Sequence, residues 1–272
     1  MAYQRPTGGI RGSHDGWTFE ELAGAYNYDN TSDRRATLVD LVVQESRKRA
    51  TPVCILDIGC GTGISEDAPA NVAFLKTVRD NCQQLWGIEP DANSLPTHGM
   101  FDRLENTTME LADLPDGSVD IAFSYFVMEH VDEPDRFMRA VCRCLKPGGC
   151  YIFMTPNARH YFTIVAKFFK TLGISDTVVR LLRGKALTES YHYPVRYKFN
   201  SPKTIDKSAA AAGLATPEYA YIERDAPRGY FPGPTVAICW LLAQKRKVLR
   251  KPKNLLELIC RVQKPAECRG PQ

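Results

Sequence analysis

The chain has 272 residues, of which 44% are hydrophobic and 24% are charged, and its net charge at pH 7 is +4. This size predicts one large α/β domain, or one domain with a cap. We expect neither a membrane span nor a signal peptide, because the sequence has no apolar run of about 18 residues and residues 1–17 have no apolar segment. The nine cysteines form no Cys-x-x-Cys pair, which argues against a disulfide framework or zinc site and indicates a reducing, cytoplasmic compartment.

The first 50 residues predict a leader that precedes the main domain. Residues 1–16 are rich in glycine and polar side chains, which is typical of a flexible arm. Residues 17–28 predict a short helix followed by an aromatic turn. Ser32 and Asp33 are suited to cap a second helix, because their side-chain oxygens can accept hydrogen bonds from its first backbone amides.

A buried strand and a glycine turn follow the leader. Residues 53–58 are apolar apart from Asp57, which predicts a parallel strand buried on both faces. Glycines then alternate at Gly59, Gly61 and Gly63, and glycine lets a backbone turn sharply and approach a ligand closely. The spacing differs from the dinucleotide fingerprint G-x-G-x-x-G, whose third position falls on Ile64. An acid at the mouth of such a turn repels phosphate and suits a cation.

The string ILDIGCGTG, residues 55–63, closely resembles the first motif of class I S-adenosylmethionine-dependent methyltransferases. The resemblance implies an α/β, Rossmann-like fold: a seven-stranded, mostly parallel sheet with an antiparallel last strand, helices on both faces and a helical lid insertion. It implies S-adenosylmethionine as cofactor and S-adenosylhomocysteine as product, with Asp57, Gly59, Gly61 and Gly63 beside the cofactor. It further implies that Tyr26 and Arg34 close over the cofactor, with the arginine facing its carboxylate. Packing of the leader aromatics on the domain is the alternative.

A second strand ends in acids. Residues 72–82 predict a helix, and residues 84–91 predict a short strand that ends in acids. An acid at the tip of this strand can accept charge-assisted hydrogen bonds from both ribose hydroxyls, and Glu89 is the candidate. The string GIEPD, residues 87–91, resembles the second motif of the family and adds Pro90 to the expected cofactor-binding residues.

Residues 106–118 resemble the family segment whose loop holds the adenine. Family members often have an acid at the position that Thr108 occupies here, and Met109 and Glu110 follow it. We expect these three residues at the cofactor, although the departure from the family pattern leaves the adenine contacts open.

The fourth strand is predicted at residues 119–124. The segment after it resembles the post-strand motif of the family, which implies that Ser124 and Tyr125 lie beside the cofactor and His130 one helical turn further on. A histidine there is a candidate general base, because its pKa lies near the operating pH. A structural histidine is the alternative.

Residues 136–145 predict an amphipathic helix, and a Pro-Gly-Gly turn leads into a fifth strand at 150–154. The resemblance thus runs without a break over residues 53–157. The chain lacks the N/D-P-P-Y/F motif of relatives that methylate bases, the double-glutamate loop of protein arginine methyltransferases and the aspartate set of metal-dependent catechol enzymes. It is most similar to the small-molecule methyltransferases of quinone-biosynthesis type, so we expect no metal and no nucleic acid.

Residues 158–200 form an insertion with apolar residues at helical spacing. Three interpretations stay open: a helix packed on the domain, a lid over the acceptor, and a helix on a membrane surface. The lid is favoured because insertions at this place enclose the substrate in similar enzymes. The candidates for acceptor binding are Tyr161, Tyr191 and Arg196, and the further catalytic candidates are His192, as alternative base, and Tyr193.

Residues 201–264 are expected to complete the sheet, before a tail at 265–272. They predict helices at 201–212 and 235–249 and strands at 218–223 and 255–262, and the resemblance implies that the last strand lies between strands five and six. Six basic residues fall between 245 and 253, where we expect a solvated helix end rather than a nucleic-acid site.

Charge is uneven along the chain. Residues 101–135 carry ten acids and one base, whereas residues 158–200 carry eight bases and two acids. This pattern suits a cationic cofactor and an anionic substrate. We expect an enzyme, monomeric or homodimeric, that methylates oxygen on a small-molecule acceptor, with sulfur methylation as the alternative. A non-catalytic cofactor-binding partner subunit and a nucleic-acid methyltransferase are the hypotheses of other classes.

Overall fold

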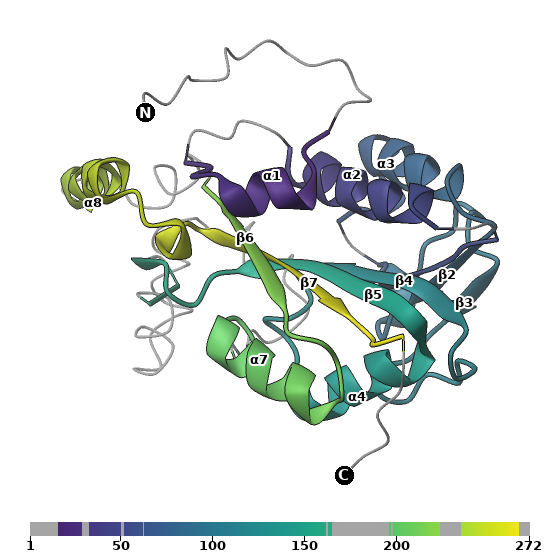
Figure 1. The fold of residues 1–272 in the computed structure, drawn as a ribbon. Helices are drawn as coiled ribbons and strands as arrows, with labels where there is room; N and C mark the ends of the chain where they lie inside the picture. The colour runs from purple at the N-terminus through teal and green to yellow at the C-terminus, as the bar shows by residue number, and fades with distance from the viewer. Residues whose placement is uncertain are drawn as a thin grey trace.

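The fold is one seven-stranded sheet between two layers of helices (Figure 1). The computed structural model describes residues 16–28, 33–49, 52–61, 63–161, 163–164, 196, 198–223 and 235–266. The strands are β1 Cys54–Ile58, β2 Gln84–Ile88, β3 Arg103–Glu105, β4 Val119–Tyr125, β5 Leu145–Pro156, β6 Glu218–Ile222 and β7 Glu257–Gln263. Their order across the sheet is β3-β2-β1-β4-β5-β7-β6.

The pairing of the strands confirms the predicted sheet. Strands β1 to β5 pair in parallel, while β7 lies between β5 and β6 and is antiparallel to both. Parallel strands need crossover connections, and helices supply several of them on the two faces of the sheet. The carboxyl ends of the parallel strands therefore lie at one edge, which is where open α/β sheets bind ligands.

Helices cover both faces of the sheet (Figure 1). On one face lie α1 Phe19–Gly24, α2 Arg34–Arg47 and α3 Pro69–Arg79, and on the other lie α4 Pro134–Cys144 and α7 Pro202–Ala211. The last helix, α8 Thr235–Leu249, projects at one end of the molecule, and short 3-10 turns occur at η1 Ala92–Ser94 and η4 Pro252–Asn254. Within these described parts of the chain, no helix has both the length and the apolar character to cross a bilayer.

The core has two layers, one on each face of the sheet. In β1, Leu56 packs into the layer under α4 and α7, while Ile55 packs into the layer under α2 and α3. All five residues of β1 are buried, as the apolar run predicted. The strand that carries the glycine turn is thus held from both sides.

Helix ends follow the capping residues. Asp33 caps α2 by accepting hydrogen bonds from the backbone of Arg35 at 2.7 Å and of Ala36 at 3.4 Å, as expected. Helix α3 begins at Pro69, three residues before the predicted start. Proline suits the first turn of a helix because its amide nitrogen has no hydrogen to leave unpaired. Pro69 therefore begins the helix instead of lying in the loop before it.

Two strands differ from their prediction. The seven strands expected include β3, but the sequence gives no position for it, because its three residues at the sheet edge are partly buried or exposed and form no apolar run. Strand β5 begins at Leu145, earlier than the predicted 150, and its register to β4 jumps between the Val119 and Ile121 pairings. Residues 146–149 bulge out there, and Gly148 takes a positive φ of 76° in the bulge.

Candidate functional site

The predicted cofactor residues converge where β1, β2 and β4 end. The turn after β1 is fixed to the last residue of β2, because the backbone amides of Gly59 and Cys60 donate to the carbonyl of Ile88 at 2.8 and 3.1 Å. On the other side, Asp57 pairs with Phe123 of β4 in the register of the sheet. The glycine turn therefore lies between the ends of its two neighbouring strands.

The turn is packed so closely that side chains would not fit. Gly59 and Gly63 have φ values of 79° and 86°, in the left-handed region that glycine adopts most readily. A Cβ atom on Gly59 would lie 2.5 Å from the side chain of Val127, and one on Gly63 would lie 2.6 Å from the ring of Tyr125. Tyr125 ends β4 and Val127 follows it, so glycine lets the end of β4 and the segment after it pack against the turn.

Glu89 is held at the mouth of the turn by backbone amides. Its carboxylate accepts hydrogen bonds from Gly61 N and Asp91 N, both at 2.9 Å, and the residue is 3% exposed. A Cβ atom on Gly61 would lie 2.6 Å from this carboxylate, so only glycine permits the approach. Pro90, between the two acids, is exposed. A carboxylate has about four acceptor positions, so it can serve backbone donors and ribose hydroxyls together.

Asp57 adds a second buried acid beneath the turn. The pKa of Asp57 is raised to about 7, mainly by burial and also by the nearby Glu89 charge, although a hydrogen bond from the Ser65 hydroxyl opposes the shift. Two desolvated acids in one place favour a positively charged ligand, whose field would offset the cost of ionising them. The acids and the glycine cradle thus fit a ligand that combines ribose hydroxyls with a cationic centre.

A cavity of about 290 Å³ opens beside Gly63. Its lining consists of Asp33, Arg34, Arg35, Gly63, Glu66, Asn71 and Tyr125. The leader helix α2 therefore brings the predicted Arg34 to the same cavity as Gly63 and Tyr125. Most of the lining side chains are charged or polar, and they come from the start of α2, the loop before α3 and the first turn of α3.

Arg34 is engaged by a residue that the sequence did not reveal. Its guanidinium lies 2.6 Å from the carboxylate of Glu257, the first residue of β7, and 5.0 Å from the centre of the Phe126 ring. The side chain of Glu257 is 1% exposed. The only signal in the sequence for this role of Glu257 was an acid at the start of a mostly apolar strand. Contact between Arg34 and the cofactor carboxylate stays a prediction.

The predicted adenine loop follows β3. Thr108 is exposed and Glu110 is half-buried, whereas Met109 is 2% exposed and packs in the hydrophobic core. Asn106, which was not predicted, donates from its side chain to the carbonyl of Glu89 at 2.8 Å and so ties this loop to the tip of β2. Contact between the cofactor and the three predicted residues stays a prediction.

The end of β4 carries two predicted residues with different surroundings. Ser124 is fully buried, and its hydroxyl shares a hydrogen bond of 2.6 Å with the Tyr151 hydroxyl inside the core. Tyr125 is half-buried at the cavity and makes an edge contact with Phe126 at 4.6 Å between ring centres. Phe126 has a φ of 57°, which is unusual for an aromatic residue and marks strained backbone beside the glycine turn.

His130 lies half-buried in the turn after β4, where its amide donates to the carbonyl of Val127 at 2.9 Å. Its neighbour Glu129 is 1% exposed and accepts a hydrogen bond from the Thr155 hydroxyl at 3.2 Å. Burial raises the pKa of Glu129 to about 7. The side-chain amide of Asn200 donates to the same Thr155 oxygen at 2.6 Å, so a buried polar chain links the turn after β4, β5 and the segment before α7.

The acceptor side is described only in part. Tyr191, His192 and Tyr193 lie outside the described residues, as does most of the predicted lid. Arg196 is exposed, pairs with Asp132 at 3.3 Å and donates its backbone amide to the carbonyl of Glu129 at 2.6 Å.

The aromatics Tyr26 and Tyr161 contact α8. The Tyr26 hydroxyl donates to the carbonyl of Arg246 at 2.6 Å, and the guanidinium of Arg246 lies 4.8 Å from the centre of the Tyr161 ring. The side chain of Arg246 also approaches the buried Glu223 carboxylate at 3.2 Å. Burial, reinforced by the Arg246 charge, lowers the pKa of the adjacent His160 to about 3, so His160 is neutral near pH 7. This cluster was not predicted, because its members are far apart in the sequence.

Known proteins resemble this chain in sequence. The model of a family described as "Methyltransferase domain" matches residues 18–216, which is most of the chain. The chain is 30% identical over 121 residues to a "probable S-adenosylmethionine-dependent methyltransferase" of Mycolicibacterium smegmatis, covering 43% of this chain and 44% of the relative. It is 28% identical over 172 residues to a ubiquinone biosynthesis O-methyltransferase of Paraburkholderia phymatum, covering 63% and 68%. It thus spans less than half of the mycobacterial relative.

Solved structures share the fold at low sequence identity. One is the cyclase SpnF, with a TM-score of 0.51, 21% identity, and coverage of 89% of this chain and 85% of that chain. Identity this low shows the fold alone, and the name of that protein illustrates that one fold can carry different reactions. The family match over most of the chain is the stronger finding. The chain belongs to the methyltransferase domain family.

Proposed function

We propose that the protein transfers a methyl group from S-adenosylmethionine to an oxygen atom of a small-molecule acceptor. The observation that carries the cofactor half of this proposal is the Glu89 carboxylate, which two backbone amides fix at the mouth of the glycine turn. The choice of oxygen is supported by relatives named as ubiquinone biosynthesis O-methyltransferases. The choice of a small acceptor is supported by the absence of sequence motifs for bases or protein arginine.

The residues around the turn would divide the cofactor between them. Glu89 would accept hydrogen bonds from the ribose hydroxyls, and Asp57 would supply negative potential beneath the cationic part. Arg34 would face the carboxylate of the methionine part across the cavity that it shares with Gly63 and Tyr125. When bound, the cofactor supplies a methyl group on a sulfonium. Transfer of this methyl group leaves a neutral thioether.

The protein mainly has to align the two reactants and exclude water, which can contribute roughly 7–11 kcal/mol to lowering the barrier. A hydroxyl acceptor also has to lose its proton, and His130 is the candidate base within the described residues. His192 and Tyr193 are alternatives. Tyr161, Tyr191 and Arg196 remain the proposed acceptor contacts.

Calorimetric titration with S-adenosylmethionine and S-adenosylhomocysteine tests the cofactor half. We expect micromolar binding by the wild type. Hydrogen bonds to a charged group contribute about 1.5–3 kcal/mol each, so losing two in Glu89→Ala should weaken binding at least about 100-fold. Glu133→Ala, which removes an exposed acid from the acid-rich segment 101–135, is the matched control and should bind normally. Absence of binding by the wild type would contradict the proposal.

Methyl transfer to a panel of phenols, carboxylic acids and thiols then tests the acceptor half. We expect phenols or carboxylates to be methylated, and His130→Ala to lower kcat for phenols while leaving cofactor affinity unchanged. If only thiols are methylated, the acceptor atom is sulfur and not oxygen. Cofactor binding without turnover of any acceptor, even with candidate partner proteins added, would favour a non-catalytic role.

A further inference from the structure

Helix α8 and the turn after it are basic and contain no acid. Residues 235–256 include Lys245, Arg246, Lys247, Arg250, Lys251 and Lys253, and no Asp or Glu. The first half of the helix, residues 235–243, has no charged residue at all. An uncharged half-helix followed by a row of cations is therefore presented at the projecting end of the molecule (Figure 1).

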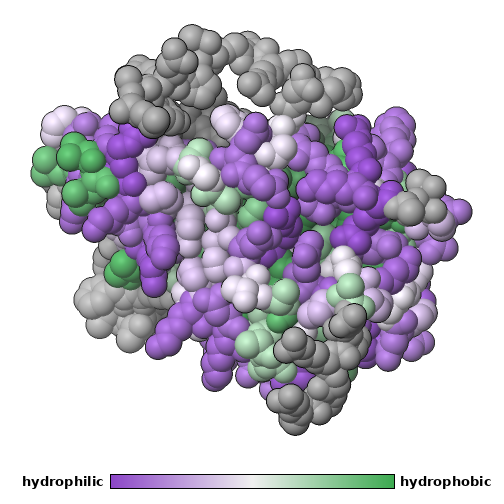
Figure 2. All heavy atoms as spheres, in the orientation of Figure 1, coloured by the Kyte–Doolittle hydropathy of each residue, from purple (hydrophilic) through white to green (hydrophobic). Residues whose placement is uncertain are grey.

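Large apolar side chains on this helix are exposed to solvent. Trp240 is 53% exposed, Leu241 60% and Val248 79%, and Leu249 is 48% exposed. Leu241, Lys245, Val248 and Leu249 follow helical spacing and share one side of the helix. Figure 2 shows the strongly hydrophobic patch at the projecting end, bordered by hydrophilic residues. Exposed apolar side chains gathered in one place are typical of an interaction surface.

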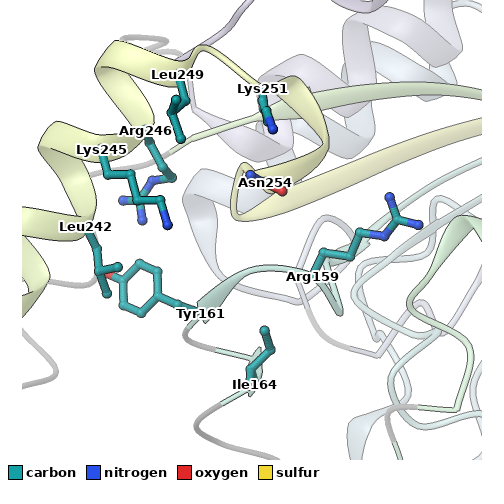
Figure 3. A pocket seen from close by; sticks show the side chains of 9 residues that line it. All are labelled: Arg159, Tyr161, Ile164, Leu242, Lys245, Arg246, Leu249, Lys251 and Asn254. Carbon is teal, nitrogen blue, oxygen red and sulfur yellow. The ribbon is translucent and has the colours of Figure 1, made fainter.

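A cavity of about 190 Å³ lies between α8, η4 and the residues that follow β5 (Figure 3). Four cations line it: Arg159, Lys245, Arg246 and Lys251. Tyr161, Leu242 and Leu249 supply apolar walls, so the cavity combines positive charge with apolar surface. Cations beside apolar side chains suit an anionic headgroup that carries acyl chains.

We propose that α8 and this cavity dock the protein on the surface of an anionic lipid bilayer. Tryptophan prefers the bilayer interface, where its ring is in apolar surroundings and its N–H can reach water. Lysine side chains extend their charge toward headgroups while their stems cover apolar surface. The 15 residues of α8 are fewer than the roughly 20 needed to span a bilayer, so the helix lies in the interface.

A bilayer explains the combination better than a nucleic acid does. Phosphate groups of a nucleic acid would satisfy the cations, but they would leave Leu241, Val248 and Leu249 in water. An anionic bilayer satisfies both, because headgroups meet the cations and acyl chains meet the apolar side chains. The inference does not depend on catalysis.

Flotation with phospholipid vesicles tests the docking surface in the full chain. We expect binding to vesicles that contain phosphatidylglycerol and none to vesicles of phosphatidylcholine alone. A cation near an anionic surface contributes about five-fold in affinity, so neutralising Lys245, Lys247 and Lys251 to Gln together should weaken binding on the order of 100-fold. The matched control neutralises the exposed Lys76, Lys203 and Lys207 to Gln and should bind like the wild type.

A second measurement locates the contact. Brominated acyl chains should quench part of the tryptophan fluorescence of bound wild type, and Trp240→Phe should remove that quenching while the protein still floats. Circular dichroism checks that each variant remains folded. The proposal is overturned if the wild type does not bind anionic vesicles, if both lysine variants bind equally, or if the basic surface retains an RNA oligonucleotide but no vesicles.

Discussion

The two ends of the sheet edge are built by different means. At the cofactor end, the decisive contact joins residues 28 apart in the sequence, Gly61 and Glu89, and runs through a backbone amide. At the opposite end, the Tyr26 hydroxyl meets the backbone carbonyl of Arg246 across 220 residues. The side chain of Arg34, at the cofactor cavity, likewise meets that of Glu257 across 223 residues. Backbone geometry set by glycine leaves a readable motif, whereas side-chain contacts between distant segments leave none.

The two ends also differ in charge. Asp57 and Glu89 place buried acids at the glycine turn, while Arg159, Lys245 and Lys251 line the cavity near α8. The first arrangement suits a cation and the second an anion. Each end is therefore expected to respond to a different set of substitutions.

Gly61→Ala should have the largest effect on the cofactor end. The new Cβ would lie 2.6 Å from the Glu89 carboxylate, which must move and lose its hydrogen bond to the amide of residue 61. We expect S-adenosylhomocysteine affinity, measured by calorimetry, to fall on the order of 100-fold, because displaced Glu89 no longer meets the ribose hydroxyls.

Gly24→Ala is the matched control for this change. Gly24 ends α1, and a Cβ there would have no heavy atom within 4 Å. Its affinity should equal that of the wild type. Normal binding by Gly61→Ala would show that the turn tolerates a side chain and that Glu89 is not the anchor of the ribose.

Local and distant contacts also differ in how far the sequence predicts them. The buried strand β1, the positive φ of Gly59 and Gly63 and the position of Glu89 follow from local residues, so they could be predicted. The antiparallel position of β7 came from the resemblance and is confirmed. Glu257 as the partner of Arg34, and Glu223 beside Arg246, could not be predicted, because only the folded chain brings these side chains together.

The buried Glu129, in the turn after β4, allows a test of how its raised pKa affects stability. Burial raises its pKa from 4.5 to about 7, so the folded protein holds a proton that the unfolded chain releases above about pH 4.5. Stability from this group is fully present below pH 4.5 and is lost as the pH rises to about 7. Glu129→Gln stays neutral, so it should be more stable than the wild type at pH 8 by on the order of 2 kcal/mol, and equally stable near pH 4.

Urea unfolding at pH 4.5, 6 and 8 measures this difference. Glu133→Gln changes an exposed carboxylate four residues away and should leave the pH profile as in the wild type. Asp57, whose pKa burial also raises to about 7, contributes a similar loss in both proteins, so only the difference between them reports on Glu129. An identical profile for Glu129→Gln and the wild type would show that Glu129 ionises normally.

Tyr26→Phe should have the smallest effect and sharpens the division most directly. The change removes the hydrogen bond of 2.6 Å that the Tyr26 hydroxyl donates to the carbonyl of Arg246. Burial raises the pKa of this hydroxyl to about 12, so it keeps the proton that it donates. We expect a loss of about 1 kcal/mol in the free energy of unfolding, as for Tyr219→Phe, whose hydroxyl donates to Asp206 at 2.6 Å. S-adenosylhomocysteine affinity should not change in either variant. If Tyr26→Phe alone weakens it more than about five-fold, equivalent to about 1 kcal/mol, the leader aromatics close over the cofactor as well as packing on α8.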